Sequence, residues 1–255
     1  MVTEMAANIV KRAECAVKES KEKFVATVSG VTLPSSNRSG EVVMARDVIA
    51  YSVAAPAEFA TNPITGPTLL GLKEEKIAKS EDVAALVAKC VKGFDLSSDE
   101  MLIIHFNFTQ VRAPKDVYVT SFKCVFVNHL QKTFNMKSLL ENTKARKKEG
   151  LLFTSAIGGV CRTAVVVPIS GDDAKNMDTL KATLTEGETF NAMKNKPSRS
   201  GSLVKLVKLT KIPIEKGAIK DEKMKENMLK MIKAAEKANE DPEKNPFVAI
   251  SVSKN

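Results

Sequence analysis

EMLIIHFNFTQVRAPKDVYVTSFKCVFVN, residues 100–128, decides the fold class of this 255-residue chain. Its first half places apolar side chains at every second position, which is the pattern of a half-buried β-strand. The apolar even positions are Leu102, Ile104, Phe106 and Phe108. Residues 117–128 repeat the alternation after a short turn, with Ser121 and Lys123 as interruptions. The stretch therefore predicts an antiparallel hairpin.

Two amphipathic helices are predicted near the ends of the chain. Apolar residues recur three and four positions apart from Val2 to Val17 and again from Met224 to Ala235, which is the helical period. Asp241-Pro242 ends the second pattern. We expect the N-terminal helix to dock on its own domain, and the alternatives are a membrane surface or a neighbouring subunit.

Shorter elements are predicted between these helices. Runs rich in β-branched residues favour strands, and they lie at residues 24–33, 41–54, 160–169 and 247–252. Capping and stop residues favour helices, at residues 80–92 and 138–149. Because strands and helices follow one another irregularly, the predicted class is α+β, a mainly antiparallel sheet with the N-terminal and C-terminal helices packed on it.

A single domain spanning residues 1–255 is expected, since 44% apolar residues can form a substantial core. Prolines at positions 56, 63 and 67 predict a proline-rich loop without regular structure at residues 55–72. The composition of residues 191–202 predicts a flexible basic loop.

Positive charge is concentrated late in the chain. Lys194 to Lys216 carries six lysines and one arginine against one acid, a net charge of +6, while the whole chain carries +9. Such a local excess favours a polyanionic partner, and the alternative is a solvated lysine surface. The predicted phosphate contacts are Lys194, Lys196, Arg199, Lys205, Lys208 and Lys211. A second predicted patch consists of Lys144, Arg146, Lys147 and Lys148.

The local structure of residues 203–212 is ambiguous, because lysines at every third position fit neither a regular strand nor a regular helix. The Val, Leu and Ile residues, together with Pro213, favour a strand with one exposed edge.

Aromatic side chains in the predicted hairpin are candidates for stacking on the bases of single-stranded nucleic acid. They are Phe106, Phe108, Tyr118 and Phe122. Phe106 and Phe108 share the apolar face and are better explained as core residues, whereas Tyr118 and Phe122 remain candidates for stacking.

No catalytic residues, metal ligands, cofactor or small-molecule substrate are predicted. The four cysteines lack metal-ligand spacing and are expected to be buried free thiols. A cysteine nucleophile would need His105 or His129 beside a thiol. Cys124 and His129 differ by an odd number, which places them on opposite faces of a regular strand.

These features together predict a non-enzymatic nucleic-acid-binding structural protein that contacts RNA or single-stranded DNA through the backbone and self-associates, such as a virus-encoded nucleoprotein, coat or movement protein. The alternatives are a self-assembling matrix-type protein on anionic membranes and a cysteine-dependent hydrolase. The charged N-terminus lacks a signal-peptide core and no apolar run approaches a membrane span. An intracellular, cytoplasmic and reducing location is therefore expected.

Overall fold

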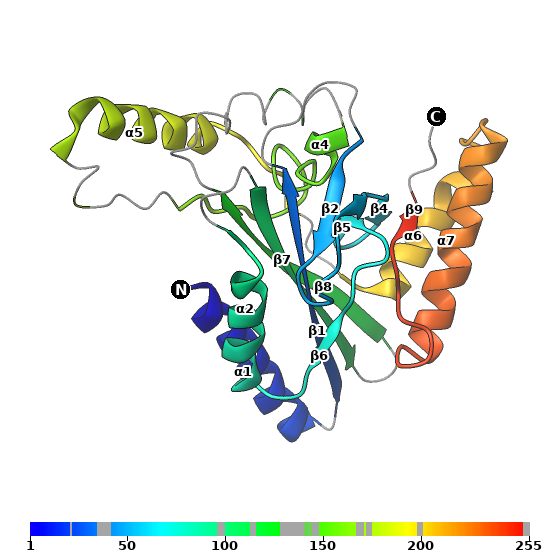
Figure 1. Cartoon of the computed structure of the whole chain (residues 1–255). Helices are drawn as coiled ribbons and strands as arrows, with labels where there is room; N and C mark the ends of the chain where they lie inside the picture. Colours follow the sequence, from blue (N-terminus) through cyan, green and yellow to red (C-terminus); the bar gives the residue numbers. More distant parts are fainter. Residues whose placement is uncertain are drawn as a thin grey trace. The chain divides into compact units, whose positions relative to one another are not determined.

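Figure 1 shows the computed structural model of the chain, which describes residues 1–20, 22–34, 42–95, 100–112, 116–127, 141, 143, 148–166, 171, 175–197 and 201–251. The helices are α1 (Val2–Ser20), α2 (Asp82–Lys92), α4 (Lys148–Leu151), α5 (Met177–Asn191), α6 (Leu203–Glu215) and α7 (Glu222–Glu240). The strands are β1 (Lys23–Pro34), β2 (Met44–Asp47), β3 (Ala55–Pro56), β4 (Phe59–Asn62), β5 (Gly66–Leu69), β6 (Glu75–Ile77), β7 (Glu100–Arg112), β8 (Asp116–Val127) and β9 (Ile250–Ser251). The predicted α+β class is confirmed.

The contacts divide the chain into two compact units. Unit 1 consists of Met1–Asn128 and Ser200–Asn255, and unit 2 of His129–Arg199. All the strands, together with α1, α2, α6 and α7, belong to unit 1, and α4 and α5 belong to unit 2. The single folding domain expected from the sequence stays a prediction.

The hairpin predicted from residues 100–128 forms the centre of unit 1 and is confirmed. β7 and β8 pair antiparallel from Met101–Val127 to Arg112–Asp116, and β7 also pairs antiparallel with β1 along its whole length. The strand order is β3-β2-β1-β7-β8, and β2 and β6 share the outer edge of β1. The predicted pairing of the two N-terminal strands is also present, although the second strand is shorter than expected.

Helices α1 and α2 cover one face of this sheet (Figure 1). The even-numbered residues of β7 point to this face, where Leu102, Ile104 and Phe106 are fully buried. The helices contribute Ala6, Val10, Val83, Val87 and Cys90 to the same core. α1 therefore docks on its own unit through part of the predicted apolar face, Ala6 and Val10, whereas Met5 and Ile9 of that face are exposed.

The opposite face of β7 is buried as well in the first half of the strand. Met101, Ile103 and His105 are all buried, although they alternate with the core residues just described. The prediction of a half-buried strand is therefore wrong for residues 101–106. Met101 and Ile103 are themselves apolar, and a central strand with structure packed on both faces buries both sets of side chains.

Helices α6 and α7 pack on this second face near the β7–β8 turn. Val117 and Val119 of β8 form one buried cluster with Leu203 of α6 and with Ala235 and Ala238 of α7. The C-terminal helix predicted from its apolar stripe is confirmed, and Asp241 ends it as expected.

The proline-rich segment contains short strands where the sequence predicts an irregular loop. β4 and β5 pair from Phe59–Leu69 to Asn62–Gly66, and β9 pairs with β4. The Asn62 side chain accepts hydrogen bonds from the backbone N–H groups of Ile64 (2.9 Å) and Thr65 (3.1 Å), which stabilises the turn. Pro67 lies on the edge strand β5, where a missing N–H donor is tolerated.

Residues 203–215 form helix α6, so the strand favoured for residues 203–212 is wrong. The Ser202 hydroxyl accepts a hydrogen bond from the Lys205 backbone N–H at 3.0 Å and caps the first turn. Leu203 and Thr210 are buried on one side of the helix. The helical spacing of the buried side chains therefore matches the structure of this segment, and the lysines occupy the rest of the helix surface.

Unit 2 departs most from the predictions. α5 covers a polar stretch for which no helix was expected. Residues 160–166 form bends and irregular backbone, so the strand predicted from residue 160 is wrong over that part. Gly150, expected to stop a helix, lies inside the four-residue helix α4.

Candidate nucleic-acid interface

Two of the predicted phosphate-binding lysines lie exposed on α6. The side chains of Lys205 and Lys208 are exposed, and no ion pair joins either of them to a carboxylate among the described residues. They are three positions apart, so they lie on neighbouring turns of one helix face. This pair is called the α6 lysine pair below.

Lys211, the third predicted lysine on α6, is neutralised instead. Its ammonium nitrogen lies 2.8 Å from the carboxylate of Glu236 on α7. Lys211, a predicted phosphate contact, is therefore compensated by a carboxylate. An ion pair offers a phosphate less net charge than a free ammonium group.

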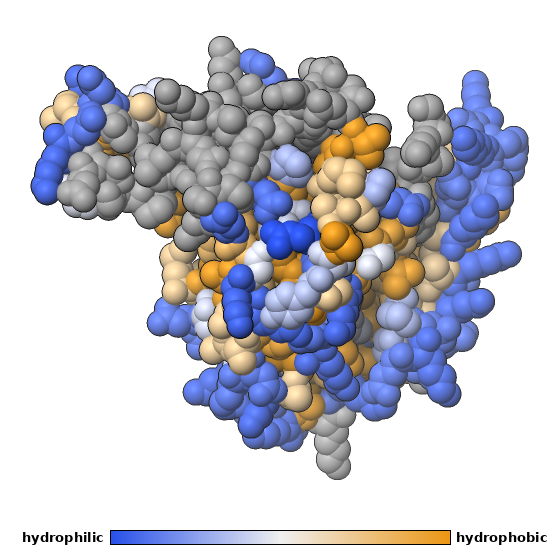
Figure 2. Space-filling view, in the orientation of Figure 1, coloured by the Kyte–Doolittle hydropathy of each residue, from blue (hydrophilic) through white to orange (hydrophobic). Residues whose placement is uncertain are grey.

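Helix α7 is strongly hydrophilic, and its surface appears mostly blue in Figure 2. Its charges largely balance, since Lys225 pairs with Glu222 at 3.6 Å and Lys230 pairs with Glu226 at 2.7 Å. The Lys230 hydrogen bond lowers the pKa of Glu226. A large number of lysines therefore does not by itself give this helix a positive surface.

Lys194 and Lys196 are exposed in unit 2, on a segment held by the residue between them. The Asn195 amide donates to the backbone oxygens of Ala156 (2.8 Å) and Cys161 (3.0 Å). Its oxygen accepts from the Gly158 N–H at 2.7 Å. The backbone at these three positions is therefore anchored, in contrast to the flexible loop that the composition predicts.

Arg162 is an exposed cation beside the Asn195 side chain, and no sequence pattern singles it out. Asn195 bonds to both neighbours of Arg162, through the Cys161 oxygen and the Thr163 hydroxyl. No ion pair involves Arg162, Lys194 or Lys196 in the part of the chain that the structure describes. An isolated arginine between apolar residues carries no charge-cluster signal, and only the fold places it near the other two cations.

The remaining predicted contacts lie outside the described residues. These are Arg199, Lys144, Arg146 and Lys147. Lys148 begins α4, but its side chain also lies outside the described part.

The aromatic candidates in the hairpin are not free to stack on bases. Phe106 and Phe108 are buried core residues, and Phe122 packs on them with its ring centroid 5.9 Å from that of Phe106. Tyr118 is half-buried, and the Arg112 guanidinium lies 4.4 Å from its ring centroid. The interpretation of Phe106 and Phe108 as core residues is confirmed.

Cys124 and His105 do not form a nucleophile–base pair. Cys124 pairs in register with Ile104 and His105 with Lys123, so Cys124 and His105 point to opposite faces of the sheet. Burial raises the pKa of Cys124 to about 12 and that of Cys90 to about 11, which disfavours a thiolate at both positions. His129 lies outside the described residues.

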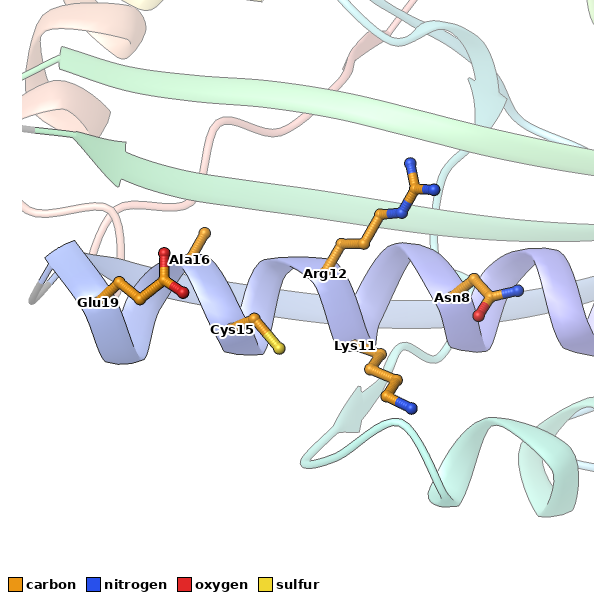
Figure 3. Close-up of a pocket in the computed structure, with 6 residues that line it drawn as sticks. All are labelled: Asn8, Lys11, Arg12, Cys15, Ala16 and Glu19. Carbon is orange, nitrogen blue, oxygen red and sulfur yellow. The ribbon is translucent and has the colours of Figure 1, made fainter.

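The other two cysteines differ from the expectation of buried thiols. Cys15 is exposed and Cys161 is half-buried. Cys15 borders a shallow surface hollow of about 440 Å³ on α1. In Figure 3 the side chains of Lys11 and Arg12 at this hollow point away from each other, so they do not converge on one ligand atom.

His105 provides a pH-dependent contribution to stability. It is 5% exposed, and its Nε2 has no hydrogen-bond partner among the described residues. Burial, followed by the Lys123 ammonium, lowers its pKa well below the ordinary 6.5. The unfolded chain therefore takes up a proton near pH 6.5 that the folded protein does not, and stability falls as the pH drops below that value.

We predict that His105→Gln reduces this acid sensitivity. The contribution of His105 is at most about 1.4 kcal/mol per pH unit. Urea unfolding of both proteins between about pH 5 and pH 8 measures it. The difference between the two stabilities should be constant above pH 7 and change in favour of the variant below pH 6.5. Parallel stability curves across the whole range would contradict the prediction.

Within the described residues, no group of three or more His, Cys, Asp or Glu side chains is arranged to hold a metal ion. None of the helices there combines the length and apolar character needed to cross a lipid bilayer. Neither a scan against protein-family models nor a search of curated proteins finds a match for the chain.

Proposed function

We propose that this protein is a non-enzymatic nucleic-acid-binding protein that contacts the phosphate backbone of RNA or single-stranded DNA. The observation that carries the proposal is the α6 lysine pair, two exposed ammonium groups on a well-capped helix that form no ion pair with any described carboxylate. Arg162, Lys194 and Lys196 of unit 2 support it as a second group of unpaired cations.

Unpaired lysines on a packed helix suit phosphate binding for an electrostatic reason. A phosphate that meets an ammonium group releases condensed counterions, and this gain is largest where no protein carboxylate already neutralises the cation. α6 is fixed to the sheet through Leu203, so both lysines project from a positioned backbone. Such contacts carry no sequence information, which agrees with the predicted lack of sequence specificity.

The test compares three double variants on a single-stranded oligonucleotide. For Lys205→Ala/Lys208→Ala we expect weaker binding and a shallower slope of log K against log salt. The magnitude of the slope should decrease by about 1.4, about 0.7 for each lost contact. Alanine keeps the helix propensity high. Electrophoretic mobility shift or fluorescence anisotropy at several salt concentrations measures both quantities.

Two matched controls separate the α6 site from total charge. Lys225→Ala/Lys230→Ala removes two α7 lysines that form ion pairs with Glu222 and Glu226, and should leave the slope nearly unchanged. Lys211→Ala/Glu236→Ala removes the ion pair at constant net charge. A wild-type slope in the α6 variant would contradict a phosphate site on α6. An equal loss of slope in the two lysine double variants would contradict it as well.

Exposed aliphatic side chains on α6 favour a second candidate, an anionic membrane surface. Val204, Leu209 and Ile212 are exposed on the same helix as the lysine pair, and a helix with lysines beside aliphatic residues suits a headgroup region. Flotation with phosphatidylserine vesicles separates the candidates. Binding to vesicles without binding to the oligonucleotide would replace the first proposal by this one.

Self-association, a virus-encoded structural role and a reducing intracellular location belong to the proposal as predictions from the sequence. The raised pKa values of Cys90 and Cys124 support the non-enzymatic part of it.

A further inference from the structure

Tyr51 is an exposed aromatic residue on a defined turn of unit 1. Its side chain is 59% exposed, and among the aromatic side chains that the structure describes it alone is exposed. It is the last residue of the turn formed by residues 48–51, which directly follows β2. No sequence pattern singles out Tyr51, because a single tyrosine between short apolar runs looks like part of a strand.

The backbone of Tyr51 is held in an unfavourable conformation. Its φ is 51°, in the left-handed region that side chains with a Cβ rarely adopt. Asp47 stabilises the turn, because one carboxylate oxygen accepts from the N–H groups of Ile49 (2.8 Å) and Ala50 (2.9 Å). The Ser52 hydroxyl accepts from the Asp47 N–H at 3.0 Å. A strained and exposed aromatic on a fixed turn is an observation that points to a binding role.

Charged groups lie beside the Tyr51 ring. The Lys89 ammonium is 5.8 Å from the ring centroid. Lys89 shares the carboxylate of Glu75 with Lys73, at 2.5 Å and 3.7 Å respectively. The Asp47 carboxylate lies here as well, since it accepts from the Lys73 backbone N–H, so two carboxylates offset the two ammonium groups. The exposed ring of Tyr51 is therefore the feature of this turn that a base can contact.

We propose that the polyanion bound by this protein is a single-stranded nucleic acid, one of whose bases stacks on the ring of Tyr51. This inference rests on the proposed phosphate-binding function. Stacking on an aromatic ring needs the open face of an unpaired base, and such a face is covered by neighbouring bases in a duplex. Stacking of this kind tolerates any base sequence, because every base has a π-face.

The experiment uses three polyanions: oligothymidylate of about 20 nucleotides, a DNA duplex of the same length, and heparin, which has no bases. Tyr51→Ala should weaken oligothymidylate binding by at least about fivefold. The same variant should bind heparin as the wild type does. Tyr51→Phe keeps the ring and should retain most of the affinity for the single strand.

Tyrosine fluorescence gives a second readout, because the chain has two tyrosines and no tryptophan. In a Tyr118→Phe background the signal comes from Tyr51 alone. Oligothymidylate should quench it after correction for absorbance, and heparin should not. Unchanged oligothymidylate binding by Tyr51→Ala, or no preference for the single strand over the duplex, would overturn the inference. Failure to bind any of the three polyanions would overturn the proposed function itself.

Discussion

Replacing Phe106 by alanine is expected to lower the free energy of unfolding by about 3–5 kcal/mol. The Phe106 side chain is fully buried at the centre of β7. Its ring lies between two others, with centroids 6.5 Å from Phe108 and 5.9 Å from Phe122. Truncation removes apolar contacts from the core under α1 and α2 and leaves a cavity that the surrounding sheet cannot close.

Urea unfolding followed by circular dichroism measures this loss, and Tyr51→Ala is the matched control. Both changes truncate an aromatic residue to alanine, but Tyr51 is exposed, so its truncation should change stability by less than about 1 kcal/mol. Equal effects of the two substitutions would show that Phe106 does not occupy the core described above. The control also establishes that Tyr51→Ala is folded, as the binding experiments require.

Replacing Gly201 by alanine is expected to destabilise the junction between β8 and α6 by up to about 3 kcal/mol. A Cβ at Gly201 would clash with the backbone oxygen of Val119. The two backbones are joined there, since the Val119 N–H donates to the Gly201 oxygen at 2.9 Å. Val119 cannot move away easily because it is paired with Thr109 in the sheet.

Gly171→Ala is the control for this substitution. An added Cβ at Gly171 meets no described atom within 4 Å, so the change should be near neutral. Thermal or urea unfolding of both variants measures the difference, and weaker oligonucleotide binding by Gly201→Ala is expected as well because the substitution displaces the α6 lysine pair. A Gly201→Ala protein as stable as Gly171→Ala would contradict the close approach of the two backbones.

Local patterns predicted the elements whose apolar side chains recur at a regular spacing. The β7–β8 hairpin follows from period two in residues 100–128, and α1, α2 and α7 follow from helical spacing of apolar residues. Prediction failed where the local pattern was weak or mixed. α6 was assigned to a strand because of its β-branched residues, yet burial of Leu203 and Thr210 and the Ser202 cap stabilise a helix.

The candidate site was only partly predictable for a related reason. The sequence located the excess of lysine but not its neutralisation, and Lys211 proved to be paired with a glutamate 25 positions away. Lys205 and Lys208 were predicted as phosphate contacts and are exposed in the structure, whereas Arg162 and Tyr51 were not singled out at all.

The amino-acid order by itself determined the α+β class, the central hairpin, the terminal helices and the concentration of positive charge between Lys194 and Lys216. These depend on the spacing of neighbours along the chain, which is visible in the sequence. Only the tertiary structure decided which lysines form ion pairs, that residues 203–215 are helical, and that the ring of Tyr51 is exposed with Lys89 over it. Ion pairing and burial are set by residues distant in sequence, so no local pattern encodes them.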